Sequence, residues 1–171
     1  MRDMETAELA IRSALTGHLV FTTLHTNNAA SSLPRLVDMG VEPFLLASTM
    51  DTIISQRLVR ILCDKCREGY SPTSELIESI GVAVPEDAIF FRAKGCQECN
   101  DTGYKGRTVI YEIMKMNELL RKLVLTKTGS DTLADAAKKS GMETMYETGI
   151  KKVISGITSL EEVISTTRTV F

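Results

Sequence analysis

The chain has 171 residues, of which 43% are hydrophobic and 25% charged, and its formal net charge is −2. This length suits one buried core with a small additional lobe, while the lack of a basic excess argues against nucleic-acid binding, which needs Lys and Arg to neutralise phosphates. No signal peptide opens the chain and no apolar run reaches the roughly 18 residues of a membrane span, so we expect a cytosolic protein.

The first residues predict a helix that begins almost at the start of the chain. Apolar residues recur at helical i, i+3 and i+4 spacing from Met4 to Leu15. Asp3 suits the N-cap, and Glu5 lies in the first turn near the positive end of the helix dipole. Gly17 is expected to end the helix. A helix that starts this abruptly normally follows another element.

A strand and a second helix are predicted next. Leu19, Val20 and Phe21 form an apolar run suited to burial on both faces of a parallel sheet, which predicts a strand over 18–25. A helix is expected over about 28–39, with a glycine just past its end. This helix, strand, helix order is typical of a doubly wound parallel sheet, whose ligands bind at the carboxyl ends of strands.

Two histidines flank the predicted strand. His25 lies at its carboxyl end, where two interpretations stay open: a hydrogen-bonded structural residue or a contact to a ligand, because imidazole serves both roles. His18 lies at the opposite end, and its position favours a structural role.

Further elements are predicted along the rest of the chain. Apolar and β-branched patterns indicate a helix over 41–54, strands over 56–62 and 107–113, and a helical tail that ends with 159–166. Between the two strands, 100–106 has the composition of a turn. The segment between the strands is therefore an excursion from the sheet.

Several charged residues near these elements are predicted to have structural or surface roles. Arg57 and Arg60 are expected to be solvated or salt-bridged surface charges, with subunit contacts as the alternative. Ser159 followed by Glu162 fits a capping box for the last helix. Glu161 and Glu162 are otherwise expected to be ordinary first-turn charges.

Four cysteines form the strongest motif of the chain. Cys63 and Cys66 make one CxxC, Cys96 and Cys99 make a second, and residues 67–95 separate the pairs. Two such turns can supply the four thiolates of a tetrahedral zinc site. Because the separation exceeds the usual spacing of about 15–20 residues, we expect an inserted lobe with its own short helix near 74–80.

Other states of these cysteines stay open, namely two disulfides, redox-active thiols and reduced thiols without metal. A cytosolic composition favours reduced thiols over disulfides. Four thiolates would close the coordination shell and leave no open position, so a zinc ion here is expected to be structural and not catalytic.

Several segments carry a resemblance to a known family. The chain resembles consecutive blocks of the type II secretion and type IV pilus assembly ATPases, in its tetracysteine-containing branch, over nearly its whole length. The blocks are RDMETAELA, ALTGHLVFTTLHTNNA, RLVDMGVEPFLLAS, SQRLVRILCDKC, GCQECNDTGYKGRTVIYEI and GITSLEEVI.

The resemblance implies an α/β fold: an incomplete RecA-like doubly wound sheet with an inserted small tetracysteine zinc lobe and a C-terminal helical tail. Its implied segments are the end of the ATPase core at 1–62, the zinc-binding lobe at 63–106, and the returning strand with C-terminal helices at 107–171. His25 matches the second histidine of the family's His box, which approaches the nucleotide phosphates. Arg2, Asp3 and Glu5 match the tail of the Walker B segment and, with His18, are implied at the periphery of the nucleotide site.

The phosphate loop of the family is missing from this sequence, which contains no GxxxxGK[ST] motif. Without that loop no backbone nest and no Lys hold the β- and γ-phosphates. We therefore expect a fragment that is inactive alone, with ATP and Mg²⁺ bound only in the intact parent.

The implied parent is a cytoplasmic homo-hexamer, peripheral to the bacterial inner membrane, that hydrolyses ATP and acts on inner-membrane platform proteins of secretion or pilus assembly. The tetracysteine lobe favours these motors over pilus-retraction motors, which generally lack it. The alternative is a free-standing zinc-binding interaction module without enzymatic activity.

Overall fold

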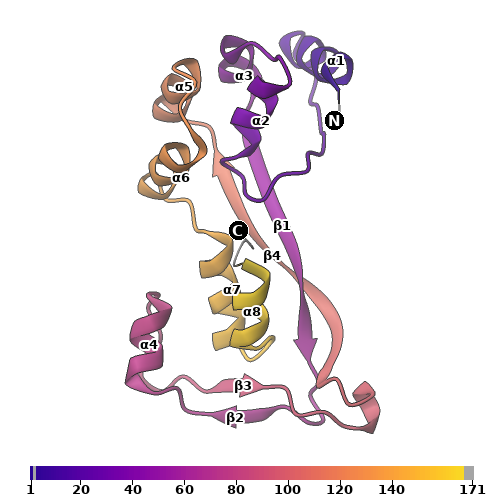
Figure 1. Cartoon of the computed structure of the whole chain (residues 1–171), viewed down its shortest axis with the longest axis vertical. Coiled ribbons are helices and arrows are strands. Elements are labelled where there is room, and N and C mark those ends of the chain that lie inside the picture. The colour runs from indigo at the N-terminus through magenta and orange to yellow at the C-terminus, as the bar shows by residue number, and fades with distance from the viewer. Residues whose placement is uncertain (2, 168–171) are drawn as a thin grey trace. The chain divides into compact units, whose positions relative to one another are not determined.

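Strands β1 (Thr52–Leu62) and β4 (Tyr104–Lys115) pair with each other in a two-stranded sheet (Figure 1). The computed structural model describes residues 1 and 3–167. Their contacts define two units, one of residues 1–55 and 112–143 and one of residues 56–111 with the segment from 144 onward. Both strands therefore contribute residues to each unit, and both predicted strands are confirmed.

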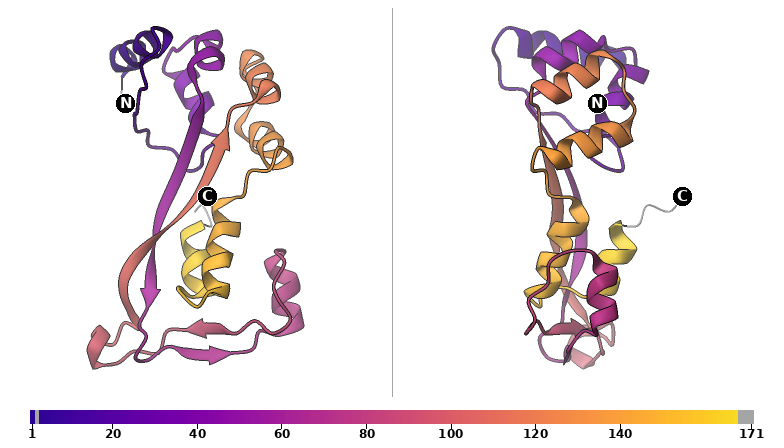
Figure 2. Two further views of the ribbon diagram at one scale, coloured as in Figure 1. Left: turned by 180° about the vertical axis from the view of Figure 1, so that it is seen from behind. Right: turned by 90° about the vertical axis from the view of Figure 1, so that its left-hand side faces the viewer.

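The first unit is built mainly from helices. They are α1 (Met4–Leu15), α2 (Ser32–Asp38), α3 (Pro43–Thr49), α5 (Glu118–Leu125) and α6 (Ser130–Lys139). Helix α3 packs against both α1 and α5, and α5 packs against α6 (Figures 1 and 2). Apolar side chains from all five helices form one core, which includes Ile11, Leu33, Leu46, Leu120 and Leu133.

Helix α1 begins and ends as the sequence predicts. The Asp3 carboxylate accepts hydrogen bonds from the backbone N–H and the hydroxyl of Thr6, both at 2.8 Å. These bonds, the backbone one foremost, hold the pKa of Asp3 below its ordinary value. Gly17 follows the helix with a φ of +87°, a conformation that glycine adopts without strain.

Residues 18–25 do not form the predicted strand. The segment has no strand hydrogen bonding, and Leu19 and Phe21 are 83% and 88% exposed. A strand needs a neighbour to pair its backbone N–H and C=O groups, and no described segment forms a ladder with this one. The prediction of a strand over 18–25 is therefore wrong, because an apolar run forms a strand only where a neighbouring segment pairs with its backbone.

Two predicted helices are shorter than expected. Helix α2 starts at Ser32, and residues 28–31 form a turn in which the Asn28 side chain accepts the Ser31 N–H at 2.8 Å. Asn favours such local side-chain bonds over a helical start. The helix predicted over 41–54 ends at Thr49, because Thr52, Ile53 and Ile54 are β-branched and begin strand β1.

The second unit contains the segment between the strands and the end of the chain. Its short strands β2 (Glu68–Tyr70) and β3 (Phe90–Arg92) pair antiparallel. Helix α4 (Ser74–Ile80) lies where the sequence predicts a helix, and a 3₁₀ turn, η1 (Gln97–Cys99), precedes β4. The segment between β1 and β4 is thus an excursion, as predicted.

Helices α7 (Met145–Ile154) and α8 (Leu160–Thr167) complete the second unit and lie side by side (Figures 1 and 2). Gly149 permits this approach, since a Cβ at that position would lie 2.5 Å from Cγ1 of Val163. Ile150, Val153 and Val163 are buried with Phe90 of β3. The helical tail is therefore confirmed.

The prediction for Glu162 is only partly right. Ser159 accepts the Glu162 N–H at 3.2 Å, as in a capping box, but the carboxylate does not return to the cap backbone. It accepts the Arg60 N–H at 2.9 Å and the Arg60 guanidinium at 2.6 and 3.0 Å. Glu162 is buried and therefore is not an ordinary first-turn charge. Arg60 is salt-bridged, one of the predicted alternatives.

Among the described residues, no helix is long and apolar enough to cross a bilayer. The predicted segments 1–62, 63–106 and 107–171 are functional parts of the chain, whereas the two units above are defined by contacts. The predicted division therefore stays a prediction.

Candidate functional site

The four cysteines lie together in the second unit. Cys63 follows β1 and Cys66 lies one turn later, while Cys96 is the N-cap of the 3₁₀ turn η1 and Cys99 is its last residue. Their Sγ atoms all lie within 4.8 Å of one another. Within the described part of the chain, this is the group of metal-ligating side chains that the structure brings to one point.

The spacing of the sulfur atoms fits a tetrahedral metal. The Sγ–Sγ distances are 3.9 Å between Cys63 and Cys96, 3.8 Å between Cys66 and Cys99, and 3.7 Å between Cys96 and Cys99. Zn–S bonds of about 2.3 Å at tetrahedral angles place two sulfurs about 3.8 Å apart, whereas a disulfide requires about 2.05 Å. The cysteines are unbridged, and their donor set suits a soft divalent metal.

Backbone turns shape this site. Cys63 donates its N–H to the Gly103 carbonyl at 2.9 Å, which joins the two ends of the lobe. Gly103 has a φ of +74°, and a Cβ there would lie 2.5 Å from Cβ of Ala93. A larger residue would therefore collide with the backbone that leads into the second CxxC.

Two backbone N–H groups point at the Cys99 sulfur, from Cys96 at 3.3 Å and from Gly103 at 3.2 Å. Burial opposes ionisation of this thiol, but the two backbone donors, together with hydrogen bonds from the Cys96 and Cys66 side chains, outweigh burial and lower its pKa. Burial raises the pKa of the Cys66 thiol. A bound metal requires deprotonated thiolates, and N–H donors of this kind stabilise them.

Arg67, directly after the first CxxC, links the site to the end of the chain. Its guanidinium donates to the Gly156 carbonyl at 2.6 Å and lies 4.6 Å from the centre of the Phe91 ring. Gly156 lies in the turn between α7 and α8, with a φ of +68°. The first cysteine turn is therefore tied to both β3 and the helical tail.

The predicted nucleotide-facing residues lie in the first unit. Asp3 caps α1, Glu5 is exposed in its first turn, and His18 Nδ1 lies 3.0 Å from the Thr16 hydroxyl. His25 is exposed, and its ring makes no hydrogen bond within the described part of the chain. Arg2 lies outside the described residues.

The segment that carries His25 is close to the start of the chain. The Met1 ammonium donates to the Thr23 carbonyl at 2.6 Å. After His25, the Thr26 and Ser32 hydroxyls lie 2.9 Å apart, and the Ala29 N–H donates to the Glu112 carboxylate at 2.7 Å. The exposed imidazole is thus followed by a well-anchored turn.

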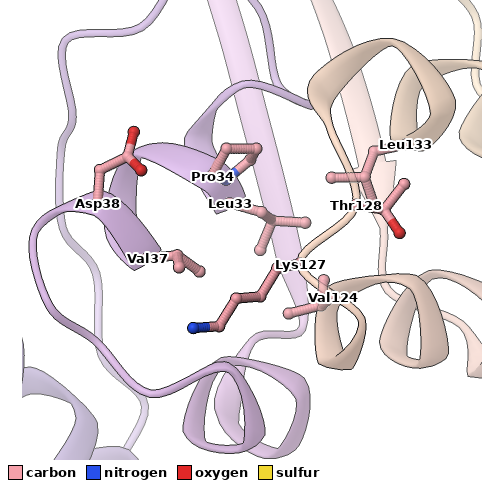
Figure 3. A pocket seen from close by; sticks show the side chains of 8 residues that line it. All are labelled: Leu33, Pro34, Val37, Asp38, Val124, Lys127, Thr128 and Leu133. Carbon is pink, nitrogen blue, oxygen red and sulfur yellow. The ribbon is translucent and has the colours of Figure 1, made fainter.

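A cavity of about 160 Å³ lies elsewhere in the first unit, between α2 and the α5–α6 region (Figure 3). Apolar side chains such as Leu33, Val124 and Leu133 line it, together with the charged side chains of Lys127 and Asp38. None of the predicted site residues contributes to its lining, so the cavity is separate from the candidate site.

The comparisons with known proteins decide the family. A family model described as "Type II/IV secretion system protein" matches residues 1–165. The chain belongs to the type II/IV secretion system protein family.

Several members of the type II/IV secretion family match 98% of this chain. Type II secretion system protein E of Pseudomonas aeruginosa is 44% identical over 168 residues, and that of Xanthomonas campestris pv. campestris is 48% identical over 169 residues. Type IV pilus assembly ATPase PilB of Thermus thermophilus is 40% identical over 169 residues. The chain spans 33%, 30% and 19% of the lengths of these relatives.

Two solved structures share the fold of this family member. The crystal structure of the pilus retraction motor PilT with bound ADP matches with a TM-score of 0.64 and 27% identity, over 99% of this chain and 38% of that one. The Legionella pneumophila ATPase DotB matches with a TM-score of 0.58 and 23% identity, over 95% and 35%. These likenesses confirm the predicted RecA-like α/β class.

Sequence reasoning missed Glu112 in this type II/IV secretion family chain. The carboxylate is buried on β4 between Ile110 and Met114, which are also buried. The sequence did contain a signal for the burial of Glu112. Successive side chains of a strand point to opposite faces, so residue 112 shares the face of Ile110 and Met114.

Proposed function

We propose that this chain is part of a cytoplasmic, hexameric ATPase that powers type II protein secretion or type IV pilus assembly at the inner membrane. The observation that carries this proposal is the match of 98% of the chain to type II secretion system protein E and to the pilus assembly ATPase PilB. Because the chain spans a third or less of these relatives, the activity belongs to the longer protein.

The proposal assigns a structural zinc ion to Cys63, Cys66, Cys96 and Cys99. The sulfur spacing and the all-cysteine donor set support it. A bound zinc would supply a cross-link between the two ends of the lobe, with no open position for catalysis. The lobe itself supports a secretion or assembly motor over a retraction motor, by the resemblance stated above.

For the nucleotide site, the proposal places His25 at the γ-phosphate, where it stabilises charge that develops during transfer to water. Its exposure and the anchored turn that follows support this role. Arg2, Asp3, Glu5 and His18 are proposed at the periphery, with Asp3 acting through the cap of α1. ATP and Mg²⁺ would bind only in the longer protein, which supplies the phosphate loop.

The test is ATP hydrolysis by the longer protein compared with this chain alone. The longer protein should show Mg²⁺-dependent phosphate release, and the chain alone should remain at background. A longer protein without a phosphate loop and without hydrolysis would overturn the proposal in favour of a zinc-binding interaction module.

A further inference from the structure

Glu112 is a charged residue on an apolar face. Along β4, Ile110, Glu112 and Met114 are buried, while the residues between them are exposed. Glu112 itself is 6% exposed. Burying a carboxylate costs free energy unless donors compensate, so its presence among these side chains calls for a specific role.

The Glu112 carboxylate binds the backbone after the predicted His box. Its Oε1 accepts the Ala29 N–H at 2.7 Å, across 83 residues of sequence. Ala29 is fully buried and Ala30 is 1% exposed. Because water does not reach this N–H, the carboxylate is the acceptor that compensates its burial.

Three further hydrogen bonds of the turn are local. Asn28 and Ser31 bond each other at 2.8 and 3.0 Å, and the Thr26 hydroxyl meets that of Ser32. Such bonds define the shape of the turn but do not attach it to the sheet. The bond that Ala29 donates to Glu112 does attach it, and Ala29 lies four positions beyond His25.

We propose that Glu112 is a positioning residue for ATP hydrolysis. It holds the turn at Ala29 against β4, and thereby fixes where the preceding segment presents His25 to the γ-phosphate. This inference rests on the proposed function, because it requires a nucleotide at His25. A displacement of about 1 Å at such a group can lower turnover up to about 100-fold.

Two substitutions of Glu112 distinguish the effect of its hydrogen-bond acceptor from the effects of its charge and its size. Glu112→Gln keeps an oxygen that can accept the Ala29 N–H, whereas Glu112→Met keeps the length of the side chain and removes the acceptor. Val124→Ala is the control for core stability, since Val124 is buried in the core of the same unit and lies on α5, and its side chain carries no hydrogen-bonding group.

In the longer ATPase, Glu112→Met should lower kcat by about 10- to 100-fold with less than a twofold change in KM for ATP. Glu112→Gln should restore kcat to within about threefold of the unsubstituted protein. An equal loss of kcat in Val124→Ala would overturn the proposal, because the effect would then follow general stability. Unchanged kcat in Glu112→Met would overturn it too.

A second measurement uses this chain alone and needs no activity. Amide hydrogen exchange at Ala29 should become at least about tenfold faster in Glu112→Met and stay slow in Glu112→Gln. Unchanged exchange in Glu112→Met would overturn the anchoring itself. The longer protein could fail to hydrolyse ATP while Ala29 exchange responds as expected. In that case the proposed function and the catalytic part of this inference are both wrong, whereas the anchoring of the turn by Glu112 is confirmed.

Discussion

The guanidinium of Arg67 donates to the Gly156 carbonyl at 2.6 Å and lies over the ring of Phe91. This pair joins the residue after the first CxxC to the turn between α7 and α8. The cysteine site and helices α7 and α8 therefore belong to one folded unit, and we expect a substitution at either to change the stability of both.

Replacing Arg67 with Met should lower the free energy of unfolding of the second unit by about 1–2 kcal/mol, because the Gly156 carbonyl loses a charged donor. Urea unfolding followed by circular dichroism measures this change. Arg12→Met is the control, since Arg12 is exposed on α1 and its pair with Glu8 spans 3.8 Å; it should change stability by less than about 0.5 kcal/mol. Equal effects of both substitutions would contradict the role of Arg67.

The cysteine site should hold close to one zinc ion per chain, since four thiolates form a closed tetrahedral shell. Elemental analysis of protein purified without chelators measures it. Cys63→Ser should abolish zinc binding and unfold the lobe, because metal binding contributes directly to folding. Ser71→Ala, at an exposed serine of the same lobe, should retain full zinc. Substoichiometric zinc together with no titratable thiols would favour disulfides.

The Arg60–Glu162 pair should make stability depend on acid pH. Hydrogen bonds from Arg60 hold the pKa of Glu162 below its ordinary value of about 4.3. A lowered folded pKa means that the stabilisation is complete above the unfolded pKa and is lost as the pH falls through the folded pKa. We expect a contribution of about 1–2 kcal/mol at neutral pH, discounted because the Arg60 side chain is 53% exposed.

Glu162→Gln isolates this effect, since Gln does not titrate. The difference in unfolding free energy between the unsubstituted chain and the variant should shrink as the pH falls from about 5 to about 3. Taking the difference at each pH removes the effect of thiolate protonation, which both proteins share. A difference that stays constant over this range would contradict a titrating Glu162.

His25→Ala in the longer ATPase should lower kcat more than it weakens nucleotide affinity, as expected for a group that acts on charge developing at the γ-phosphate. Steady-state kinetics with a separate nucleotide-binding titration measures both quantities. Thr22→Ala is the matched control, since Thr22 is exposed in the same segment and has no proposed role at the nucleotide; it should leave both quantities unchanged. Equal losses in turnover and affinity would indicate a ground-state binding role for His25.

Residues 18–25 should make the isolated chain self-associate, because Leu19 and Phe21 are highly exposed and the backbone of this segment pairs with no strand among the described residues. Light scattering across a dilution series should show concentration-dependent species. The double substitution Leu19→Ser and Phe21→Ser should suppress them. Ile89→Ser, at an isolated exposed apolar residue of the other unit, should not. A monodisperse, unsubstituted chain at high concentration would contradict this expectation.

Features that depend on local chemistry and spacing could be predicted from the amino-acid sequence. The Asp3 cap, helix α4 between the cysteine pairs and the two strands around the lobe follow from capping residues, periodicity and β-branched runs. The cysteine cluster follows from its two CxxC motifs, because a turn of that length points both thiols the same way.

The hydrogen-bonding and strand-pairing partners of residues far apart in the sequence became known only from the fold. Strand formation at 18–25 depends on a neighbouring strand, so its apolar run could not establish pairing. Glu162 satisfies Arg60 in place of its own helix cap, and Glu112 reaches Ala29 across 83 residues. A buried carboxylate needs hydrogen-bond donors, and the fold can supply them from residues far away in the sequence. The spacing of residues along the chain does not predict which residues these are.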